Sequence, residues 1–364
     1  MQNSLAEFAR SHVAPRDLLA NPTFPPDLWA AMAEAGLFRI GLPEAHGGDG
    51  GTYASIAAAE RVLVEQGGST GLAGVWGGHQ MVARWFLAGF GSPAQQARYL
   101  SPLASGALTA GVAISEAKVG AHPKLLTTTA TPESGGWRLD GEKSYVTNGD
   151  IAGLYVVLAI TAMHGERKRY SFFLVPRDAP GLEVIEAPTP ASMRPVGHVA
   201  LRLAGCRVPA DALLGTQDAA YETMALPFRD AEDAIGTSSM AGNLAGLVRL
   251  LGAELAPTPS DAAIAELGAL AGLAAIAGPS AAALAHAVDD RLMDATEPQA
   301  LLIGLRQLAA EFHRRATAFR DAHAATRSPA LDARLNSIQT SLSVARGPRA
   351  IRMARLGAGV LARE

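Results

Sequence analysis

The chain of 364 residues is long enough to bury a large core, and usual domain sizes favour two or three packed units. Its 31 Lys and Arg residues nearly balance its 34 Asp and Glu residues, and the formal charge of −3 excludes a global positive field that would hold a nucleic acid or an anionic membrane. The single cysteine, Cys206, excludes an intrachain disulfide and a cysteine-cluster metal site, and it fits a reducing, cytoplasmic location.

Residues 1–108 are predicted to form a helical domain. The amino terminus carries Glu7 and Arg10 and lacks the apolar core of a secretion signal, so we expect no export. Apolar residues recur at helical spacing, for example at Leu28 and Met32. The glycine-rich run at 47–51 is predicted to be a loop, because so many glycines destabilise a helix or strand interior.

Residues 109–216 are predicted to form an antiparallel β-barrel. Short β-prone runs bounded by Gly, Pro, Asp or Asn lie at 127–131, 137–141, 155–159 and 171–176. Strands at this spacing indicate a compact barrel or sandwich rather than a parallel sheet.

Residues 217–364 are predicted to form a helical bundle, which makes the fold class α+β. This part is rich in alanine and has proline-containing breaks. Residues 267–285 are 19 in a row without a charge, about the length that spans a bilayer. Their Ala and Gly content and the interruption at Pro279 are more typical of a close-packed soluble helix, so we expect no membrane span.

Several local motifs occur in the order found in one enzyme family. These are Gly41-Leu42-Pro43-Glu44 with Gly47-Gly48, Ile114-Ser115-Glu116 with Gly120, the threonines at 127–129, Asp140-Gly141-Glu142-Lys143-Ser144-Tyr145-Val146-Thr147-Asn148-Gly149, and Val208-Pro209-Ala210. In this order the chain resembles the acyl-CoA dehydrogenase superfamily over residues 1–250.

The resemblance implies a flavoprotein that binds FAD and oxidises an acyl thioester. Such enzymes remove the proton alpha to the thioester carbonyl with a carboxylate base, while hydride leaves the beta carbon for the flavin. The family places the segment matching Ile114-Ser115 at the flavin edge. It places the triplet matching Tyr145, Val146 and Thr147 beside the flavin, with an aromatic ring that is usually tryptophan and a threonine hydroxyl near N5.

Two stretches depart from the family pattern at the substrate and cofactor. The resemblance implies that Ala121 and Arg229 contact the substrate, but the family has a serine where this chain has Ala121, so one donor is missing. The neighbouring His122 could replace it or be simply solvated. An Arg-x-x-Phe-Gly motif that reaches a neighbouring subunit's flavin is absent, although Arg249 lies near its expected place.

The usual catalytic base is also missing. The nearest match to the family's Glu-Gly-Thr is Arg346-Gly347-Pro348, which puts an arginine at the position of the glutamate. Some members carry the glutamate on the first helix of the third domain, and the segment 228–233 resembles that arrangement. Glu232 is therefore the candidate base, while the alternative is an acid at a helix start that complements the helix dipole.

Other functions leave weaker signals. Gly67-Gly68-Ser69-Thr70-Gly71 has the form of a hydrolase nucleophile elbow but follows a helix-like run instead of a strand. Gly357-Ala358-Gly359 is too short for a dinucleotide fingerprint, and no histidine pair of the HExxH type predicts a metal site.

Three functional hypotheses remain open. They are the dehydrogenase, a non-catalytic or altered relative that binds an acyl thioester or a protein partner, and a flavin monooxygenase on the same fold. The alanine-rich helices also predict a homo-oligomer, either a dimer or a tetramer. Acyl chain length, thioester carrier and electron acceptor leave no sequence signal.

Overall fold

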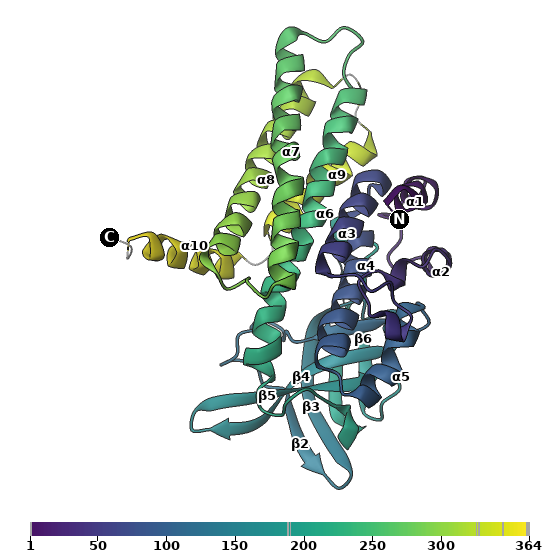
Figure 1. Cartoon of the computed structure of the whole chain (residues 1–364), viewed down its shortest axis with the longest axis vertical. Coiled ribbons are helices and arrows are strands. Elements are labelled where there is room, and N and C mark those ends of the chain that lie inside the picture. Colours follow the sequence, from purple (N-terminus) through teal and green to yellow (C-terminus); the bar gives the residue numbers. More distant parts are fainter. Residues whose placement is uncertain are drawn as a thin grey trace. The chain divides into compact units, whose positions relative to one another are not determined.

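The computed structural model describes residues 2–187, 189, 191–324, 326, 328–343 and 346–361. Helices come first, a β-sheet follows, and long helices end the chain (Figure 1). This order confirms the predicted α+β fold class. Four strands, at 129–133, 136–147, 154–164 and 167–176, lie at the predicted β-prone runs, whereas those at 110–113, 182–186, 198–209 and 213–214 had no predicted run, and the third part is helical.

The helices begin and end at recognisable signals. They are α1 Gln2–Phe8, α2 Pro26–Glu34, α3 Tyr53–Gly67, α4 Thr70–Met81, α5 Pro93–Ala104, α6 Leu226–Ala253, α7 Asp261–Asp289, α8 Thr296–His323, α9 Pro329–Ser343 and α10 Arg346–Leu361. At the start of α5, Ser92 and Gln95 exchange hydrogen bonds of 2.9 and 3.2 Å in a capping box. Helix α3 ends at Gly68, whose φ of +85° is a conformation that glycine adopts without strain.

Eight strands form one sheet. They are β1 Ala110–Ala113, β2 Thr129–Glu133, β3 Gly136–Thr147, β4 Leu154–His164, β5 Arg167–Pro176, β6 Leu182–Glu186, β7 His198–Pro209 and β8 Leu213–Leu214. Their order is β6-β7-β3-β2-β4-β5-β8, and β1 pairs with β4. The first six residues of β4 are all buried, as expected of a strand with partners on both sides.

The sheet corrects the expectation of a closed antiparallel barrel. Its described strands form an open sheet that ends at β6 and β8, and β1 and β2 both run parallel to β4. Among the described residues, β2 pairs in register with β4 at Thr129 and Ile160 alone, whereas it pairs with β3 over five positions. A barrel closes only when strand lengths and stagger match, and the two-residue β8 offers too little edge.

The chain divides into two compact units, each described by itself. One comprises Leu18–Gly51 and Gly74–Asp230 and contains the sheet. Its strands share a hydrophobic core that includes Leu139, Tyr155 and Phe173, all fully buried. Cys206 belongs to the same core and is fully buried.

The other unit comprises the chain up to Asp17, Thr52–Ala73 and the chain from Ala231 onward. It joins α3 to the long helices. The Asp289 carboxylate accepts hydrogen bonds from the first two backbone N–H groups of α3, those of Tyr53 and Ala54, at 2.8 and 3.0 Å. A side chain at Gly242 would lie 2.4 Å from the carbonyl oxygen of Arg61, so α3 and α6 pack backbone to backbone.

Helices α7 and α10 leave apolar residues exposed. Among the described residues, α7 alone is long and apolar enough to cross a membrane, and 28% of its most apolar window is buried within the chain. Length and composition fit equally a helix that packs against another protein surface. Figure 1 shows α10 turned away from the axes of α7 and α8, with Ile351 and Val360 exposed.

Candidate functional site

A bulge in β3 presents Tyr145 to solvent. The pairing of β3 with β7 shifts register between Lys143 and Val146, and both of these residues are fully buried. Tyr145 lies between them with a φ of +60° and is 66% exposed. A left-handed backbone at a residue other than glycine costs on the order of 1 kcal/mol or more. Such bulges re-aim side chains next to functional sites, and this one sets an aromatic ring outside the sheet core.

The segment Ile114–Ser115 lies alongside the bulge. Nζ of Lys143 donates to the carbonyl oxygen of Ile114 at 3.0 Å, and the N–H of Ser144 donates to the carbonyl oxygen of Ser115 at 2.8 Å. Ile114 and Ser115 are themselves half-buried, so both stay accessible. The structure thus brings Ile114 and Ser115 together with Tyr145.

Val146 and Thr147 complete the predicted triplet in different ways. The side chain of Val146 is buried in the sheet core, so only its backbone can contact a ligand. Thr147 is half-buried, and its Oγ1 lies 3.5 Å from Nε2 of His198. That distance is the upper limit for a hydrogen bond, which leaves the hydroxyl able to bind a second group. Burial lowers the pKa of His198, which favours the neutral form of its imidazole.

These residues offer chemical groups suited to a flat ligand with polar edges. The exposed Tyr145 follows Ser144, whose N–H binds the backbone of the half-buried Ser115, and the half-buried Thr147 comes two residues after Tyr145. Aromatic faces and hydroxyl donors are the groups that hold flat, polar-edged ligands. No cluster of three His, Cys, Asp or Glu residues that could hold a metal occurs in the described parts of the chain.

Ala121 and His122 lie in the loop after β1. The carbonyl oxygen of Ala121 accepts a hydrogen bond from the Tyr221 hydroxyl at 3.3 Å, and its methyl group supplies no donor. His122 is exposed. Ala121 therefore offers a ligand no side-chain donor in place of the family's serine. Its backbone carbonyl instead contacts Tyr221.

Arg229 on α6 is only partly engaged. Its Nε lies 4.0 Å from the carboxylate of the neighbouring Asp230 and, within the described structure, is buried without a hydrogen-bond partner. A buried guanidinium donor without a partner is costly. The Nε of Arg229 is thus an unsatisfied donor, and the substrate contact expected of Arg229 stays a prediction.

Glu232 lies in the second turn of α6. Its side chain is exposed, yet the protein around it disfavours the charged form and the negative charge of Asp233 adds to this, so its pKa rises to about 7. A raised pKa of this kind is common among functional carboxyl groups. The first turn of α6 contains no acidic residue, so Glu232 lies beyond the turn where the helix dipole acts most strongly.

The neighbouring acid, Asp233, is neutralised. Arg306 donates to one of its carboxylate oxygens at 2.9 Å, and Arg352 donates to the other at 2.5 Å. Two arginines therefore contact both carboxylate oxygens of Asp233 and hold this part of α6 in place. Glu232 has no ion-pair partner among the described residues, which leaves its carboxyl available for chemistry.

Sequence reasoning missed Glu60 on α3. This residue is 5% exposed, and its Oε2 is buried without a hydrogen-bond partner in the described structure. Burial and, to a smaller extent, the charge of Glu232 together raise its pKa to about 8. The one signal was an acid inside the apolar run from Ile56 to Val64.

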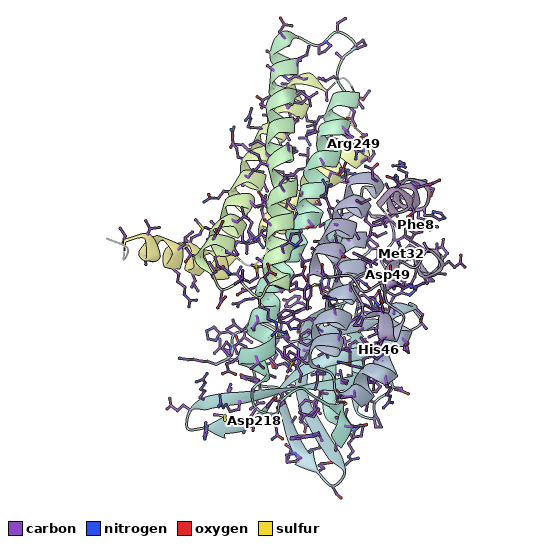
Figure 2. The ribbon with its side chains drawn as sticks, viewed as in Figure 1. Phe8, Met32, His46, Asp49, Asp218 and Arg249 are labelled. Carbon is purple, nitrogen blue, oxygen red and sulfur yellow. The ribbon has the colours of Figure 1, made fainter. Side chains whose placement is uncertain are left out.

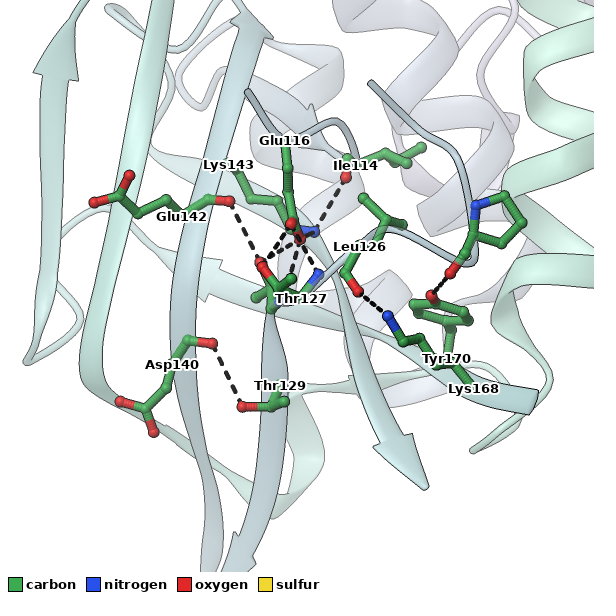
Figure 3. Close-up of polar contacts among 12 residues, drawn as sticks. Ile114, Glu116, Leu126, Thr127, Thr129, Asp140, Glu142, Lys143, Lys168 and Tyr170 are labelled. Carbon is green, nitrogen blue, oxygen red and sulfur yellow. Dashed lines mark hydrogen bonds and ion pairs between the residues drawn. The ribbon is translucent and has the colours of Figure 1, made fainter. Parts of the chain in front are cut away.

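The Glu116–Lys143 ion pair was also missed, although both residues lie within the quoted motifs. Nζ of Lys143 and Oε1 of Glu116 are 3.0 Å apart, and both side chains are buried (Figure 3). Burial disfavours the charged form of Glu116, but the charge of Lys143 and hydrogen bonds from Thr128 and Thr127 outweigh this and lower its pKa to about 2.

Two family models cover most of the parts that precede the long helices. The acyl-CoA dehydrogenase N-terminal domain matches residues 1–107, and the acyl-CoA dehydrogenase middle domain matches residues 111–206. The chain belongs to the acyl-CoA dehydrogenase superfamily. The order of motifs predicted this membership.

Curated relatives agree over the same parts. A probable acyl-CoA dehydrogenase of Bacillus subtilis is 30% identical over 218 residues, which is 59% of this chain and 57% of the relative. A mitochondrial isovaleryl-CoA dehydrogenase of Oryza sativa is 30% identical over 59% of this chain and 53% of its own length. The matched region therefore spans little more than half the length of these relatives.

Solved structures match over nearly the whole chain. The butyryl-CoA dehydrogenase of Megasphaera elsdenii has a TM-score of 0.85 at 17% identity, covering 99% of this chain and 97% of that one. A prolyl acyl carrier protein oxidase has the same TM-score at 20% identity, with the same coverage of both chains. At such identities the likeness shows the fold, which extends into the long helices.

Family positions in the third part depart from the usual pattern. Arg249, labelled in Figure 2, donates to the carbonyl oxygen of Glu65 at 2.6 Å and lies 3.6 Å from its carboxylate, so it is engaged within its own unit. Arg346 begins α10, and its side chain lies outside the described residues. No acidic residue occurs from position 346 to position 361.

The rival motifs have structural explanations. Ser69 follows α3, and its Oγ accepts a hydrogen bond from the N–H of Leu72 at 3.1 Å, as a residue at a helix start does. It therefore lacks the preceding strand of a nucleophile elbow. Gly357 and Gly359 lie inside α10 and form no phosphate-binding loop.

Proposed function

We propose that the protein is an FAD-dependent dehydrogenase of acyl thioesters. The observation that carries this proposal is the β3 bulge, which presents Tyr145 next to the backbone of Ile114–Ser115, the two segments that the family resemblance assigns to the flavin. An exposed aromatic ring on a strained backbone has no role in the sheet core, and a function in binding explains why the strain is kept. The aromatic ring and the hydroxyls of Ser115 and Thr147 would hold the ring system of FAD.

In this proposal, Glu232 is the catalytic base. The proton alpha to a thioester carbonyl is too weakly acidic for water to remove at a useful rate, so a carboxylate with a raised pKa is required. Glu232 has such a pKa and no competing ion pair in the described structure. Its carboxylate would take the alpha proton, while Arg229 would orient a polar group of the substrate. Bound FAD would supply the acceptor for the hydride that leaves the beta carbon, and a carbon–carbon double bond forms.

The proposal is tested by the purified protein's absorption spectrum and by one reaction. We expect bound FAD, together with enoyl thioester when a saturated acyl-CoA and an artificial electron acceptor are added without oxygen. A protein that binds FAD, forms no enoyl thioester and instead forms an oxygenated product when oxygen and NADPH are supplied would be a monooxygenase. A protein that binds no FAD would overturn the dehydrogenase.

A second candidate is an altered relative that binds an acyl thioester without oxidising it. Two observations favour it: Ala121 provides no side-chain donor for the substrate, and Arg346 replaces the usual base. Under this alternative Glu232 has no reaction to perform. Calorimetric binding of an acyl-CoA without any exchange of its alpha protons would support it.

A further inference from the structure

A fully buried ion pair lies directly behind the candidate flavin segment. Lys143 is on β3, Glu116 follows β1, and the exposed fractions of their side chains are 1% and 7%. Figure 3 shows the two side chains meeting between the strands. Removing two opposite charges from water rarely stabilises a fold more than apolar side chains of the same size would. A buried pair at this place calls for a role other than stability.

Glu116 is held from two further residues. Its Oε2 accepts hydrogen bonds of 2.8 Å from both the N–H and the hydroxyl of Thr127, and its Oε1 accepts bonds of 3.0 and 2.7 Å from the N–H and hydroxyl of Thr128. With Lys143, the carboxylate has five donors. It therefore has one fixed position, anchored to the chain that enters β2.

Lys143 connects this fixed carboxylate to the neighbouring backbone. Its Nζ also donates to the carbonyl oxygen of Ile114 at 3.0 Å, and the next residue along β3, Ser144, binds the carbonyl oxygen of Ser115 at 2.8 Å. Residues 114, 115 and 116 are thus each tied to β3 by a separate contact. The bulge residue Tyr145 follows immediately on the same strand.

We infer that Glu116 and Lys143 are positioning residues that hold the Ile114–Ser115 backbone at a fixed distance from the Tyr145 ring. The inference rests on the proposed function, because it assigns this geometry to FAD binding. The pair touches no ligand itself. It fixes the two walls of the site relative to one another before a ligand arrives, and preorganisation of this kind raises affinity.

The experiment removes both charges at once, because one charge left alone in the core would disrupt folding. The double variant Glu116→Gln/Lys143→Met keeps the approximate size of both side chains. A matched control uses the exposed pair next to it, Glu142 and Arg202, which lie 3.1 Å apart with 66% and 49% exposed side chains. The control variant is Glu142→Gln/Arg202→Met.

The readouts are FAD affinity, from fluorescence titration of the flavin-free protein, the visible circular dichroism of bound FAD, and the thermal midpoint without FAD. We expect the double variant to melt within a few degrees of wild type, to bind FAD at least 10-fold more weakly, and to give an altered dichroism. The control should match wild type in all three. Unchanged affinity and dichroism in a folded double variant would overturn the inference alone, whereas wild-type protein that binds no FAD would overturn the proposed function with it.

A milder variant decides the matter if the double variant does not fold. Thr127 is exposed at the protein surface, and Thr127→Val removes one of the donors that fix Glu116 while leaving the ion pair in place. We expect it to weaken FAD binding about 3-fold at an unchanged thermal midpoint. Wild-type affinity in a folded Thr127→Val protein would then contradict a positioning role.

Discussion

Glu232 is the side chain on which the proposed reaction depends most directly. A base acts only after it has lost its proton, and the pKa of Glu232 is about 7. Exchange of the alpha protons of an acyl thioester should therefore rise with pH and level off above about 7. Glu232→Gln should reduce this exchange on the order of 1000-fold without weakening FAD binding. Exchange measured by NMR in deuterated buffer checks both statements, and a variant that exchanges at the wild-type rate would place the base elsewhere.

The buried carboxyl group of Glu60 should make the stability of the protein depend on pH. The folded protein keeps this carboxyl protonated up to a pKa of about 8, whereas the unfolded chain releases the proton above about 4.5. Folded protein thus binds more protons in this window, and the free energy of unfolding falls as pH rises from about 4.5 to about 8. Glu60→Gln should remove this loss and raise the free energy of unfolding at pH 8 by on the order of 1 to 3 kcal/mol.

Urea unfolding at several pH values tests this. The difference in free energy of unfolding between Glu60→Gln and wild type should grow with pH and then become constant. Glu166→Gln, at an exposed hairpin residue, is the matched control for the loss of a carboxyl group. A difference that is the same at every pH would mean that Glu60 is not protonated in the folded state.

At the scale of the element, the β3 bulge lowers the stability of the fold and, in our proposal, favours FAD binding. Tyr145 has a φ of +60° and is 66% exposed, so glycine at this position would relieve the strain while losing little packing. Tyr145→Gly should raise the free energy of unfolding of the flavin-free protein by about 1 kcal/mol and weaken FAD binding. The control is Arg291→Gly, which changes an exposed residue with a φ of +58°. This control should raise the free energy of unfolding by a similar amount without changing FAD affinity. A Tyr145→Gly protein that binds FAD with wild-type affinity would show that the bulge has no part in flavin binding.

The strands themselves could be predicted, whereas their pairing could not. Runs such as 155–159 and 171–176 are rich in β-prone residues and are bounded by turn residues. This pattern is local and can be recognised in the sequence. The parallel contact of β2 with β4 joins Thr129 to Ile160, and no local pattern specifies it. The open, partly parallel pairing of the sheet was therefore not predicted, although the α+β fold was.

The candidate site divides in the same way. Ser115, Tyr145 and Thr147 were found because motifs preserve their order along the chain. Glu60 and the partnership of Glu116 with Lys143 were not, because burial depends on what covers a side chain in the folded protein. The positive φ of Tyr145 was equally invisible, since tyrosine carries no sequence signal for a left-handed backbone.

For the molecule as a whole, we predict self-association through α7. Ile264 and Ile276 are each 54% exposed on this apolar helix, and exposed apolar surface of this kind is commonly buried between subunits. The wild-type protein should be a dimer or tetramer in light scattering at micromolar concentration. The variant Ile264→Glu/Ile276→Glu should be smaller, whereas Leu125→Glu, which changes a 50% exposed residue, should not. A monomeric wild-type protein would end this prediction.

The complete burial of Cys206 makes the chain suitable for fluorescent labelling. Burial raises the pKa of its thiol to about 11, and the negative charge of Asp140 adds to this, so the reactive thiolate is scarce at neutral pH. Native protein should take up no maleimide dye, and urea-unfolded protein should take up one equivalent. A cysteine introduced at Met163, which is 54% exposed near the end of β4, would then carry the dye alone. Its emission would report the arrival of a flavin at the sheet in real time, without removal of the native thiol.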